Sequence, residues 1–238
     1  MKKFVVAAFA LALSAGHAFA GDCARFAGLS VGANGGWASQ QSTWNDPDDW
    51  VDNFSFDFNT SSFSRTRSGV TLGAEAGYTW QTHCTVFGVS VDGNWADIGD
   101  SKTFSPAPGG TQLTLSDNLN WYGTLQTRAG IIVDNLMLYA TGGVALANIE
   151  HGWSINDPVI PARESFSAES LRFGGVGGIG TELAWGDHWT IKSETLYFIF
   201  DEKKTTGFSP AGNQNVEWLN QDSLWVSRMS LNYKFDSP

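Results

Sequence analysis

The stretch SLWVSRMSLNYKF, residues 223–235, alternates between two kinds of side chain. One parity is apolar and holds Trp225, Met229, Leu231, Tyr233 and Phe235, and the other is polar and holds Arg228, Ser230, Asn232 and Lys234. Successive side chains of a β-strand point to opposite faces, so this pattern predicts a strand with one apolar and one polar face. The strand ends in aromatic residues, as a strand leaving a membrane at its interface would.

The N-terminus has the parts of a secretory signal peptide. Two lysines precede an apolar stretch, and Ala18-Phe19-Ala20 has the A-x-A pattern of a cleavage site. We therefore expect residues 1–20 to be a signal peptide, with cleavage between Ala20 and Gly21. Residues 21–238 would then form one domain in an oxidising, exported compartment.

Composition excludes several classes of protein. The 238-residue chain has a formal net charge of −10, which disfavours nucleic acid as a partner. It holds 27 Gly, 11 Trp and 16 Phe but 3 Met, which is typical of β-barrels rather than of long helices. The longest apolar run, residues 136–149, is interrupted by Thr, Gly and Asn, so it does not predict a membrane-spanning helix. An exported chain with apolar strand faces indicates the outer membrane of a Gram-negative cell.

Alternation of the same kind recurs along the chain and predicts eight strands. The clearest example is VTLGAEAGYTWQ, where every second residue from Val70 to Trp80 is apolar. In the stretch LNWYGTLQTRAGI, Leu119, Trp121, Leu125 and Ile131 are expected to share the outer face. The predicted strands are residues 28–37, 70–81, 87–95, 119–131, 136–146, 177–185, 190–200 and 223–235.

The connections between these strands alternate in length. Short ones fall at residues 82–85, 132–135 and 186–188, and long ones at residues 39–68, 100–117, 150–170 and 201–222. Short turns at one end and long loops at the other are the pattern of an outer-membrane barrel, with the turns in the periplasm. The prediction is an all-β, eight-stranded antiparallel up-and-down transmembrane β-barrel, in which the last strand pairs with the first. A lipocalin-type barrel would place the apolar parity inside, and it fits export and aromatic strand ends less well.

Four parts of the chain carry a family resemblance: LSVGANGGW; LGAEAGYTWQ with FGVSVDGNWADI; LNWYGTLQTRAGI with LYATGGVALANI; and IGTELAWGDHWTIKSETLYFIF with VSRMSLNYKF. Together they resemble the porin-like outer-membrane β-barrels of alphaproteobacteria, the small OmpA-like barrels. This resemblance implies a surface-exposed protein in contact with outer-membrane lipid and lipopolysaccharide, inserted by the barrel-assembly machinery. Some relatives bind haem or act as adhesins, so it also implies a host or surface ligand at the long loops. The family usually ends on Phe, whereas residues 236–238 follow Phe235 here.

The predicted inner faces collect charged residues that could fill the lumen. They are Glu75, Asp92, Glu182 and Glu194 with Arg128, Lys192, Arg228 and Lys234. An eight-stranded barrel is only wide enough for side chains to fill its interior, so these charges must pair. We expect Arg128 and Arg228 each to contact at least one of the glutamates. The favoured interpretation is a static plug of ion pairs, and the alternative is a narrow, gated pore or ligand-uptake channel.

The chain has two cysteines, and both are expected near the short-turn end of the predicted barrel. Cys23 precedes the first strand and Cys84 lies in the short connection after the second, so both should lie at the periplasmic rim, where a disulfide between them is plausible. Residues 175–180 match G-x-G-x-x-G, but they lie within a predicted strand and lack the following helix that dinucleotide binding needs.

Candidate residues for catalysis or for a cofactor are few. His83 and His188 fall in periplasmic turns, and His151 is expected to be the histidine that faces outside. We therefore expect no enzyme activity, no metal and no cofactor, with an outer-membrane lipid-modifying enzyme as the least favoured alternative. Aromatic residues of the first long loop, such as Trp44, are expected to pack on the barrel rim or to support strand extensions above the membrane.

Overall fold

A computed structural model of the chain describes residues 23–47, 62–105, 112–156, 163–209 and 214–235. The predicted signal peptide, its cleavage site and residues 236–238 lie outside these ranges. The described residues form nine strands: β1 (Gly28–Asn45), β2 (Ser62–Thr82), β3 (Thr85–Phe104), β4 (Gln112–Val133), β5 (Leu136–Asn156), β6 (Arg163–Trp185), β7 (Trp189–Phe200), β8 (Lys203–Ser209) and β9 (Gln214–Lys234). None of the described residues forms a helix long and apolar enough to cross a membrane.

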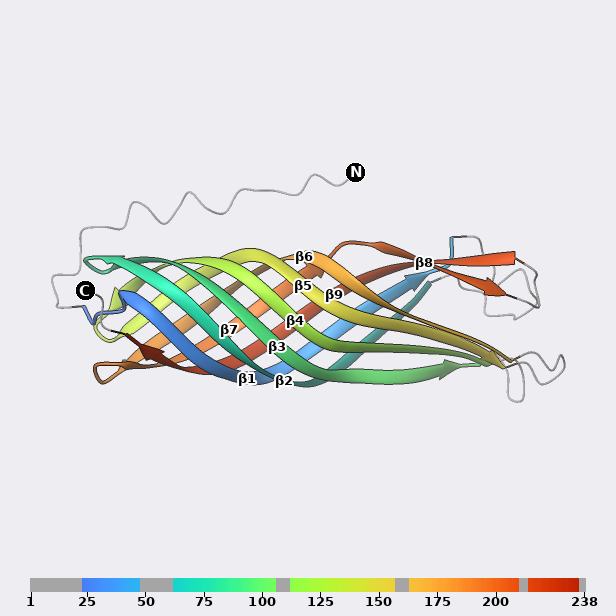
Figure 1. Ribbon diagram of the computed structural model, residues 1–238, viewed down its shortest axis with the longest axis horizontal. Helices are drawn as coiled ribbons and strands as arrows, with labels where there is room; N and C mark the ends of the chain where they lie inside the picture. The colour runs from blue at the N-terminus through green and yellow to red at the C-terminus, as the bar shows by residue number, and fades with distance from the viewer. Residues whose placement is uncertain (1–22, 48–61, 106–111, 157–162, 210–213, 236–238) are drawn as a thin grey trace.

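The strands close into an antiparallel ring, which confirms the predicted architecture (Figure 1). Each strand from β1 to β7 pairs with the next, and β9 pairs with both β7 and β1. Because β7 and β8 follow one another along β9, they together form the seventh of eight positions around the ring. The ends with short turns and with long connections are called the turn end and the loop end.

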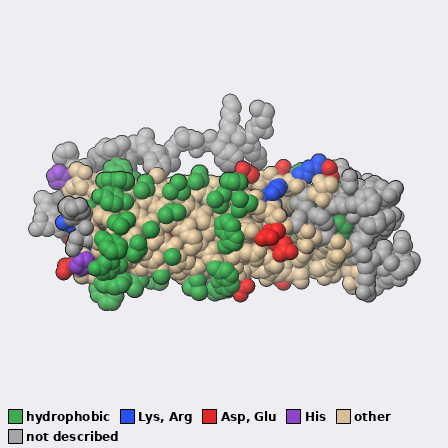
Figure 2. All heavy atoms as spheres, in the orientation of Figure 1, with side chains coloured by type: hydrophobic (Ala, Val, Ile, Leu, Met, Phe, Trp, Pro, Cys, Tyr) green, Lys and Arg blue, Asp and Glu red, His purple; other side chains and the backbone are tan. Residues whose placement is uncertain are grey.

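Apolar side chains face outward between two aromatic belts. The belt nearer the turn end contains Trp80, Phe87, Trp185, Trp189 and Phe235. The outer belt contains Trp37, Trp95, Trp121, Phe173 and Trp225. On β9 the two belts are ten residues apart, about 25 Å at ~3.3 Å per residue and ~40° tilt, as a hydrocarbon layer requires. Figure 2 shows hydrophobic side chains gathered over this part of the surface, with most charged ones toward the loop end.

One expected outer residue faces inward. Leu119 is 1 % exposed and packs in the core, because a β-bulge at Asn120 shifts the parity of β4. Below the bulge Trp121 and Leu125 face outward as predicted, and above it Leu113 and Leu115 face inward with Leu119. An extra residue in one strand reverses which face each later side chain occupies.

The strands are longer than predicted and continue past the outer belt. Most of the predicted long loops are strand, including residues 39–45, 62–68, 100–104 and 150–156. Side chains of both parities are mainly polar there, so apolar–polar alternation does not reveal the strands.

Beyond the outer belt the ring separates into two sheets (Figure 1). Lobe A consists of β8 and the loop-end parts of β9, β1 and β2, and lobe B of the loop-end parts of β3, β4, β5 and β6. Pairing between β2 and β3 stops at Val70 and Asp97, and pairing between β6 and β7 stops at Gly174 and Phe200. Within the described residues no ladder crosses the two seams above these points. One backbone hydrogen bond, from the Asp201 N–H to the Phe173 oxygen (2.9 Å), and contacts between side chains join the lobes there.

Candidate functional site in the barrel lumen

The lumen is filled by alternating apolar and ionic layers. From the turn end these are an apolar seal, a lower ionic layer, a middle apolar layer, an upper ionic layer and an aromatic layer between the lobes. All strands except β8 contribute described side chains to these layers, and along each strand inward and outward residues alternate. The layers together decide whether anything can pass through the barrel.

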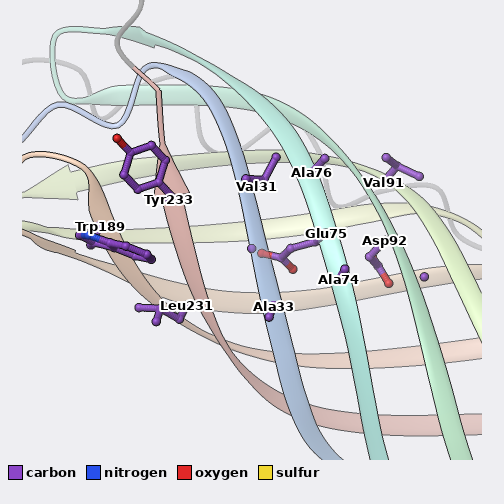
Figure 3. A pocket seen from close by; sticks show the side chains of 12 residues that line it. Val31, Ala33, Ala74, Glu75, Ala76, Val91, Asp92, Trp189, Leu231 and Tyr233 are labelled. Atoms are coloured by element: carbon purple, nitrogen blue, oxygen red, sulfur yellow. The ribbon is translucent and has the colours of Figure 1, made fainter.

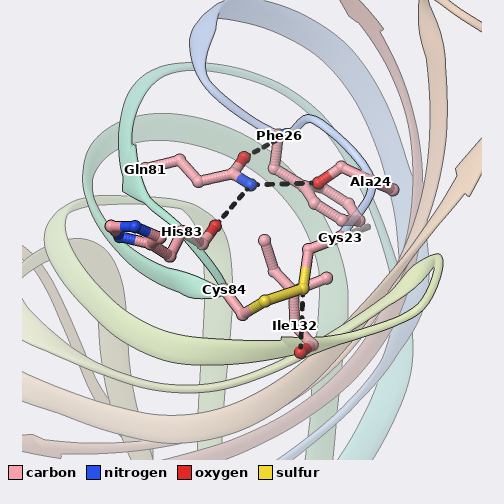
Figure 4. Close-up of a disulfide and its surroundings, with 7 residues drawn as sticks. All are labelled: Cys23, Ala24, Phe26, Gln81, His83, Cys84 and Ile132. Carbon is pink, nitrogen blue, oxygen red and sulfur yellow. Dashed lines mark hydrogen bonds between the residues drawn. A yellow bond between two sulfur atoms is a disulfide. The ribbon is translucent and has the colours of Figure 1, made fainter. Parts of the chain in front are cut away.

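The segment before β1 folds across the turn end (Figure 4). A disulfide joins Cys23 to Cys84, with Cα atoms 5.7 Å apart. The Gln81 side chain holds the same segment, because its amide donates to the carbonyl oxygen of Ala24 (3.1 Å) and its oxygen accepts from the Phe26 N–H (2.7 Å). Phe26 is 3 % exposed and packs against the inward residues Val86, Ile132, Met137 and Tyr139. The turn end is therefore closed by apolar packing.

Arg228 is the centre of the lower ionic layer. Its Nε lies 2.9 Å from Glu194 Oε2, its Nη1 lies 3.1 Å from Asp92 Oδ1, and its Nη2 lies 3.9 Å from Glu75 Oε2. Lys192 completes the group, with its Nζ 2.7 Å from Glu75 Oε1 and 3.3 Å from Glu194 Oε2. All five groups are almost fully buried. Each carboxylate contacts at least one of the two cations, as burial requires, and the three carboxylates leave the group with one formal negative charge in excess.

A second ion pair lies nearer the turn end. Arg128 Nη1 lies 2.6 Å from Glu182 Oε2, and its Nη2 donates to Thr79 Oγ1 at 2.5 Å. The Tyr139 hydroxyl donates to Glu194 Oε1 (2.7 Å) and links this pair to the group around Arg228. The structure thus brings seven of the eight predicted lumen residues into this layer. Lys234, the eighth, lies at the rim, where its ammonium donates to the carbonyl oxygen of Arg25.

In β6 the last glycine of residues 175–180, which match G-x-G-x-x-G, has a packing role. A Cβ placed on Gly180 would lie 2.4 Å from the Tyr139 ring. The missing side chain therefore lets Tyr139 lie across β6 and reach Glu194 on β7, which fits glycine in a strand where another group approaches closely.

The middle apolar layer separates the two ionic layers along the barrel axis. On β9, Leu224 and Val226 lie between Asp222 and Arg228. On β4, Leu119 and Tyr122 lie between Asp117 and Gln126. Larger side chains from β5 and β7 complete the layer: Ile149, Leu196, Phe198 and Phe200. Nearly all are less than 5 % exposed, so apolar side chains pack closely at this level of the barrel.

The upper ionic layer, called the clasp, joins the two lobes, because each lobe supplies an aspartate that contacts at least one arginine of the other lobe. Asp117 of lobe B forms salt bridges with Arg67 (2.5 Å) and Arg65 (3.4 Å) of lobe A. Asp222 of lobe A contacts Arg172 of lobe B (3.3 Å). The clasp was not predicted, because all of these residues except Arg172 fall in the expected long loops. Extending the parity of β2 past Val70 would have grouped Arg65 and Arg67 with Thr71, on the inward face.

His151 lies between the two carboxylates of the clasp. Its Nδ1 is 2.6 Å from Asp117 Oδ1 and its Nε2 is 3.2 Å from Asp222 Oδ2. The residue is 1 % exposed, so the expectation that His151 faces outside is wrong. Burial by itself would lower the pKa of His151, but hydrogen bonds to Asp117 and Asp222 and their negative charges raise it. Nε2 also lies 3.0 Å from Arg172 Nη2. Both ring nitrogens are thus in contact with buried side chains, so the ring is not available to a surface-bound haem.

Aromatic residues fill the space between the lobes above the clasp. Trp44, Phe63 and Trp218 from lobe A pack against Leu113 and Trp153 from lobe B. The Trp44 indole also donates to Asp117 Oδ1 at 3.1 Å, so the aromatic layer and the clasp are connected. Trp44 thus supports the strand extensions, as expected, while the other loop aromatics lie outside the described residues.

Described groups of His, Cys, Asp and Glu include no candidate metal site. The outer face of the barrel has a shallow hollow (Figure 3). Its small residues Ala33, Ala74 and Ala76 lie beside the larger Leu231 and Tyr233. It is almost entirely apolar and lies between the two belts, on the surface that faces lipid.

Comparisons with known proteins agree with this architecture. A family model described as an outer membrane protein beta-barrel domain matches residues 5–235. The 31 kDa outer-membrane immunogenic proteins of Brucella melitensis and Brucella suis are each 28% identical over 178 residues, which is 74% of this chain and 70% of theirs. The outer-membrane protein OprG of Pseudomonas aeruginosa is similar in structure, with a TM-score of 0.52 and 13% identity, over 89% of this chain and 97% of that one.

Proposed function

Because the chain belongs to the outer membrane protein beta-barrel domain family, we propose that it is a non-conducting surface protein of the Gram-negative outer membrane. In this proposal the barrel anchors and positions the two lobes outside the cell. The lobes, rather than the lumen, carry the interactions of the protein.

The middle apolar layer is the observation that carries the proposal. Leu224, Phe198 and Ile149 meet inside a ring that side chains alone can fill, and each is almost completely buried. An ion that crossed this layer would lose its water without gaining a protein partner, which is costly in an apolar environment. The seal around Phe26 adds a second barrier at the turn end.

Surface exposure is supported by the relatives. The Brucella proteins that this chain resembles are named as outer-membrane immunogenic proteins, which fits a protein that is accessible from outside. In this chain the strands continue well past the outer belt, so a folded part of the protein stands above the membrane. We propose that this part contacts surface or host ligands.

Conductance of the refolded protein in a planar bilayer tests the proposal. We expect no reproducible current steps from the wild type. A variant with Phe198→Gly and Leu224→Gly removes large groups from the middle apolar layer, and we expect it to conduct. The matched control is Leu231→Gly, which removes a lipid-facing side chain and should stay silent. Reproducible steps from the wild type would contradict a closed lumen.

A narrow, gated channel is the second candidate. It is favoured by the lower ionic layer, where Arg228 contacts three carboxylates and could exchange among them. Both side-chain amide atoms of Asn34 also lack a hydrogen-bond partner within the described part of the chain, which suggests that water occupies this layer. If ion pairs rather than apolar packing closed the pore, neutralising Arg128 and Arg228 would open it. Closed Arg128→Gln and Arg228→Gln variants would favour the apolar barrier.

We propose no catalytic turnover. His83 and His188 lie at the turn end, and His151 is held between two aspartates in the clasp. His151 is buried inside the barrel and not on the lipid-facing surface, where an enzyme acting on membrane lipid would need a base beside a nucleophile.

A further inference from the structure

The outer surface of lobe A carries a continuous uncharged polar face over three neighbouring strands. Strand pairing places Ser223 of β9, Gln41 of β1 and Thr66 of β2 in one row, and Gln221, Thr43 and Ser64 in the next. We call this surface the hydroxyl face, which consists of Ser39, Gln41, Thr43, Asn45, Ser62, Ser64, Thr66, Ser68, Gln221 and Ser223. Surfaces of soluble proteins usually mix charged residues among polar ones. Ten adjacent outward positions without a charge therefore need an explanation.

Hydrogen bonds across β1 and β2 order this face. The hydroxyl groups of Thr43 and Ser64 lie 3.1 Å apart, those of Ser39 and Ser68 lie 3.2 Å apart, and Ser62 donates to Asn45 at 2.8 Å. Each bond fixes side-chain rotamers but leaves other lone pairs or hydrogens of the same groups directed to solvent. A ligand with hydroxyl groups would therefore meet pre-ordered partners and lose less conformational entropy on binding.

Lobe B presents different chemistry at a similar height. Its outward positions include the carboxylates of Asp97, Glu150 and Glu169. A neutral pair also occurs there, because the hydroxyl groups of Thr103 and Thr114 lie 2.8 Å apart on β3 and β4. An anionic glycolipid would be repelled by the carboxylates of lobe B and would meet no negative charge on the hydroxyl face. Lobe A has an outward carboxylate beyond this face, Glu217, which is paired with Lys204.

The hydroxyl face begins directly above the outer belt. Ser39 follows Trp37 by two residues on β1, and Ser223 precedes Trp225 by two on β9. At ~3.3 Å per residue and ~40° tilt, Ser39 to Asn45 covers about 15 Å above the outer belt. In an outer membrane the sugars of the outer-leaflet lipopolysaccharide occupy this height.

We propose that the hydroxyl face binds the core sugars of lipopolysaccharide in the protein's own outer leaflet. Hydroxyl and amide groups donate to and accept from sugar hydroxyls, and the absence of carboxylates avoids repulsion by the phosphates of the glycolipid. The half-exposed rings of Trp37 and Trp225 lie at the base of the face, where amphipathic rings favour the membrane interface. This inference requires an outer-membrane location but does not depend on whether the lumen conducts.

Binding to purified glycolipids tests the proposal. The refolded full chain in phospholipid nanodiscs would be titrated with lipopolysaccharide that carries a complete core and, separately, with lipid A from the same source. The variant Thr43→Ala, Ser64→Ala and Thr66→Ala removes three hydroxyl groups from the face. We expect about tenfold weaker binding of core-bearing lipopolysaccharide, since each hydrogen bond contributes modestly, and unchanged binding of lipid A. The matched control, Thr103→Ala with Thr114→Ala on lobe B, should bind both probes as the wild type does.

Two results would overturn the proposal. One is wild-type affinity of the triple variant for core-bearing lipopolysaccharide. The other is an equal loss for both probes, which would place recognition at the lipid A portion. Heat-modifiable gel migration shows whether the triple variant folds. If it does not, Ser64→Asp keeps the strand intact and adds one negative charge, and we expect it to weaken core binding. Unchanged binding by Ser64→Asp would also refute the proposal.

Discussion

The ring between the aromatic belts and the two lobes above it use similar ion pairs for different purposes. Within the ring every strand has a hydrogen-bonded neighbour on both sides, so backbone ladders alone close the structure. In the lobes no described ladder joins β2 to β3 or β6 to β8 above the seams. Arg228 and its carboxylates therefore fill a barrel that is already closed, whereas Asp117 and Asp222 connect two sheets that are otherwise joined mainly by the aromatic layer above them.

The difference shows what a buried charge does in each setting. In a closed ring a buried ion pair mainly satisfies its own members, and its net contribution to stability is small because desolvation offsets attraction. Across a seam the same pair also opposes a specific motion, the separation of the lobes. Breaking one pair in each region should thus give different structural outcomes from chemically equal changes.

The largest effect is expected from Asp117→Asn. This change removes the charge that balances Arg65 and Arg67 and weakens the contact with His151, at a cost of about 3–5 kcal/mol for a broken buried pair. The lobes should separate more often while the ring stays closed. Amide hydrogen exchange should accelerate in residues 62–69 and 112–119, and heat-modifiable gel migration should be retained.

Asp92→Asn is the matched change in the ring. It removes a carboxylate from Arg228 and leaves Thr124 and Gln126 with an amide partner. We expect no faster exchange in the lobes, because no seam passes through this layer. Equal exchange in the lobes of both variants would contradict the distinction between plug and clasp.

Sequence alternation predicts the ring because lipid on one side and a packed lumen on the other demand opposite chemistry at successive residues. The lobes face water outside and ion pairs inside, so Ser64, Arg65, Thr66 and Arg67 are all polar and their strand is hidden. For the same reason His151 was assigned to an outer loop although its side chain is buried. Pairing partners such as Asp117 and Arg67 could not be predicted, because they depend on the register between strands far apart in the chain.

Two smaller differences have local causes. Leu119 was predicted to face outward, but a bulge at Asn120 turns it inward. The alternation does not reveal this bulge, because Leu119 and Trp121, on either side of Asn120, are both apolar. Lys234 shares the inward parity but lies beyond the ionic layers, at the rim. Parity predicts the face that a side chain occupies, whereas its depth in the barrel depends on strand stagger.

An intermediate effect is expected from the Cys23→Ser, Cys84→Ser double variant. The disulfide spans 61 residues, so chain entropy alone predicts a loss of up to about 4 kcal/mol. We expect a loss of about 2–4 kcal/mol, measured by urea unfolding in detergent, with unchanged exchange in the lobes. Gln81 still holds residues 24–26 in the variant, which should limit fraying at the turn end. Loss of lobe protection in this variant would show that the two ends of the barrel are coupled.

The smallest effect is the pH dependence of the clasp. The pKa of His151 is raised in the folded state, so its proton stabilises the closed lobes below about pH 6.5, the ordinary value, and this stabilisation is lost as pH rises through the raised value. The guanidinium groups of Arg65 and Arg172 are not deprotonated in that window. Hydrogen exchange in the lobes, corrected for intrinsic rates, should accelerate a few-fold between about pH 6 and pH 9.

His151→Gln separates this titration from other effects of pH. Glutamine can donate to Asp117 but takes up no proton, so lobe exchange in the variant should be the same at both ends of the pH range. Asp222 does not confound the comparison, because its pKa is lowered: burial opposes this shift, but hydrogen bonds from His151 and Ser42 outweigh it. Its contribution is lost only at acidic pH, below the tested range. A variant that kept the wild-type pH dependence would place the titrating group outside the clasp, and the closure of the lobes would then rest on the arginine pairs and the aromatic layer alone.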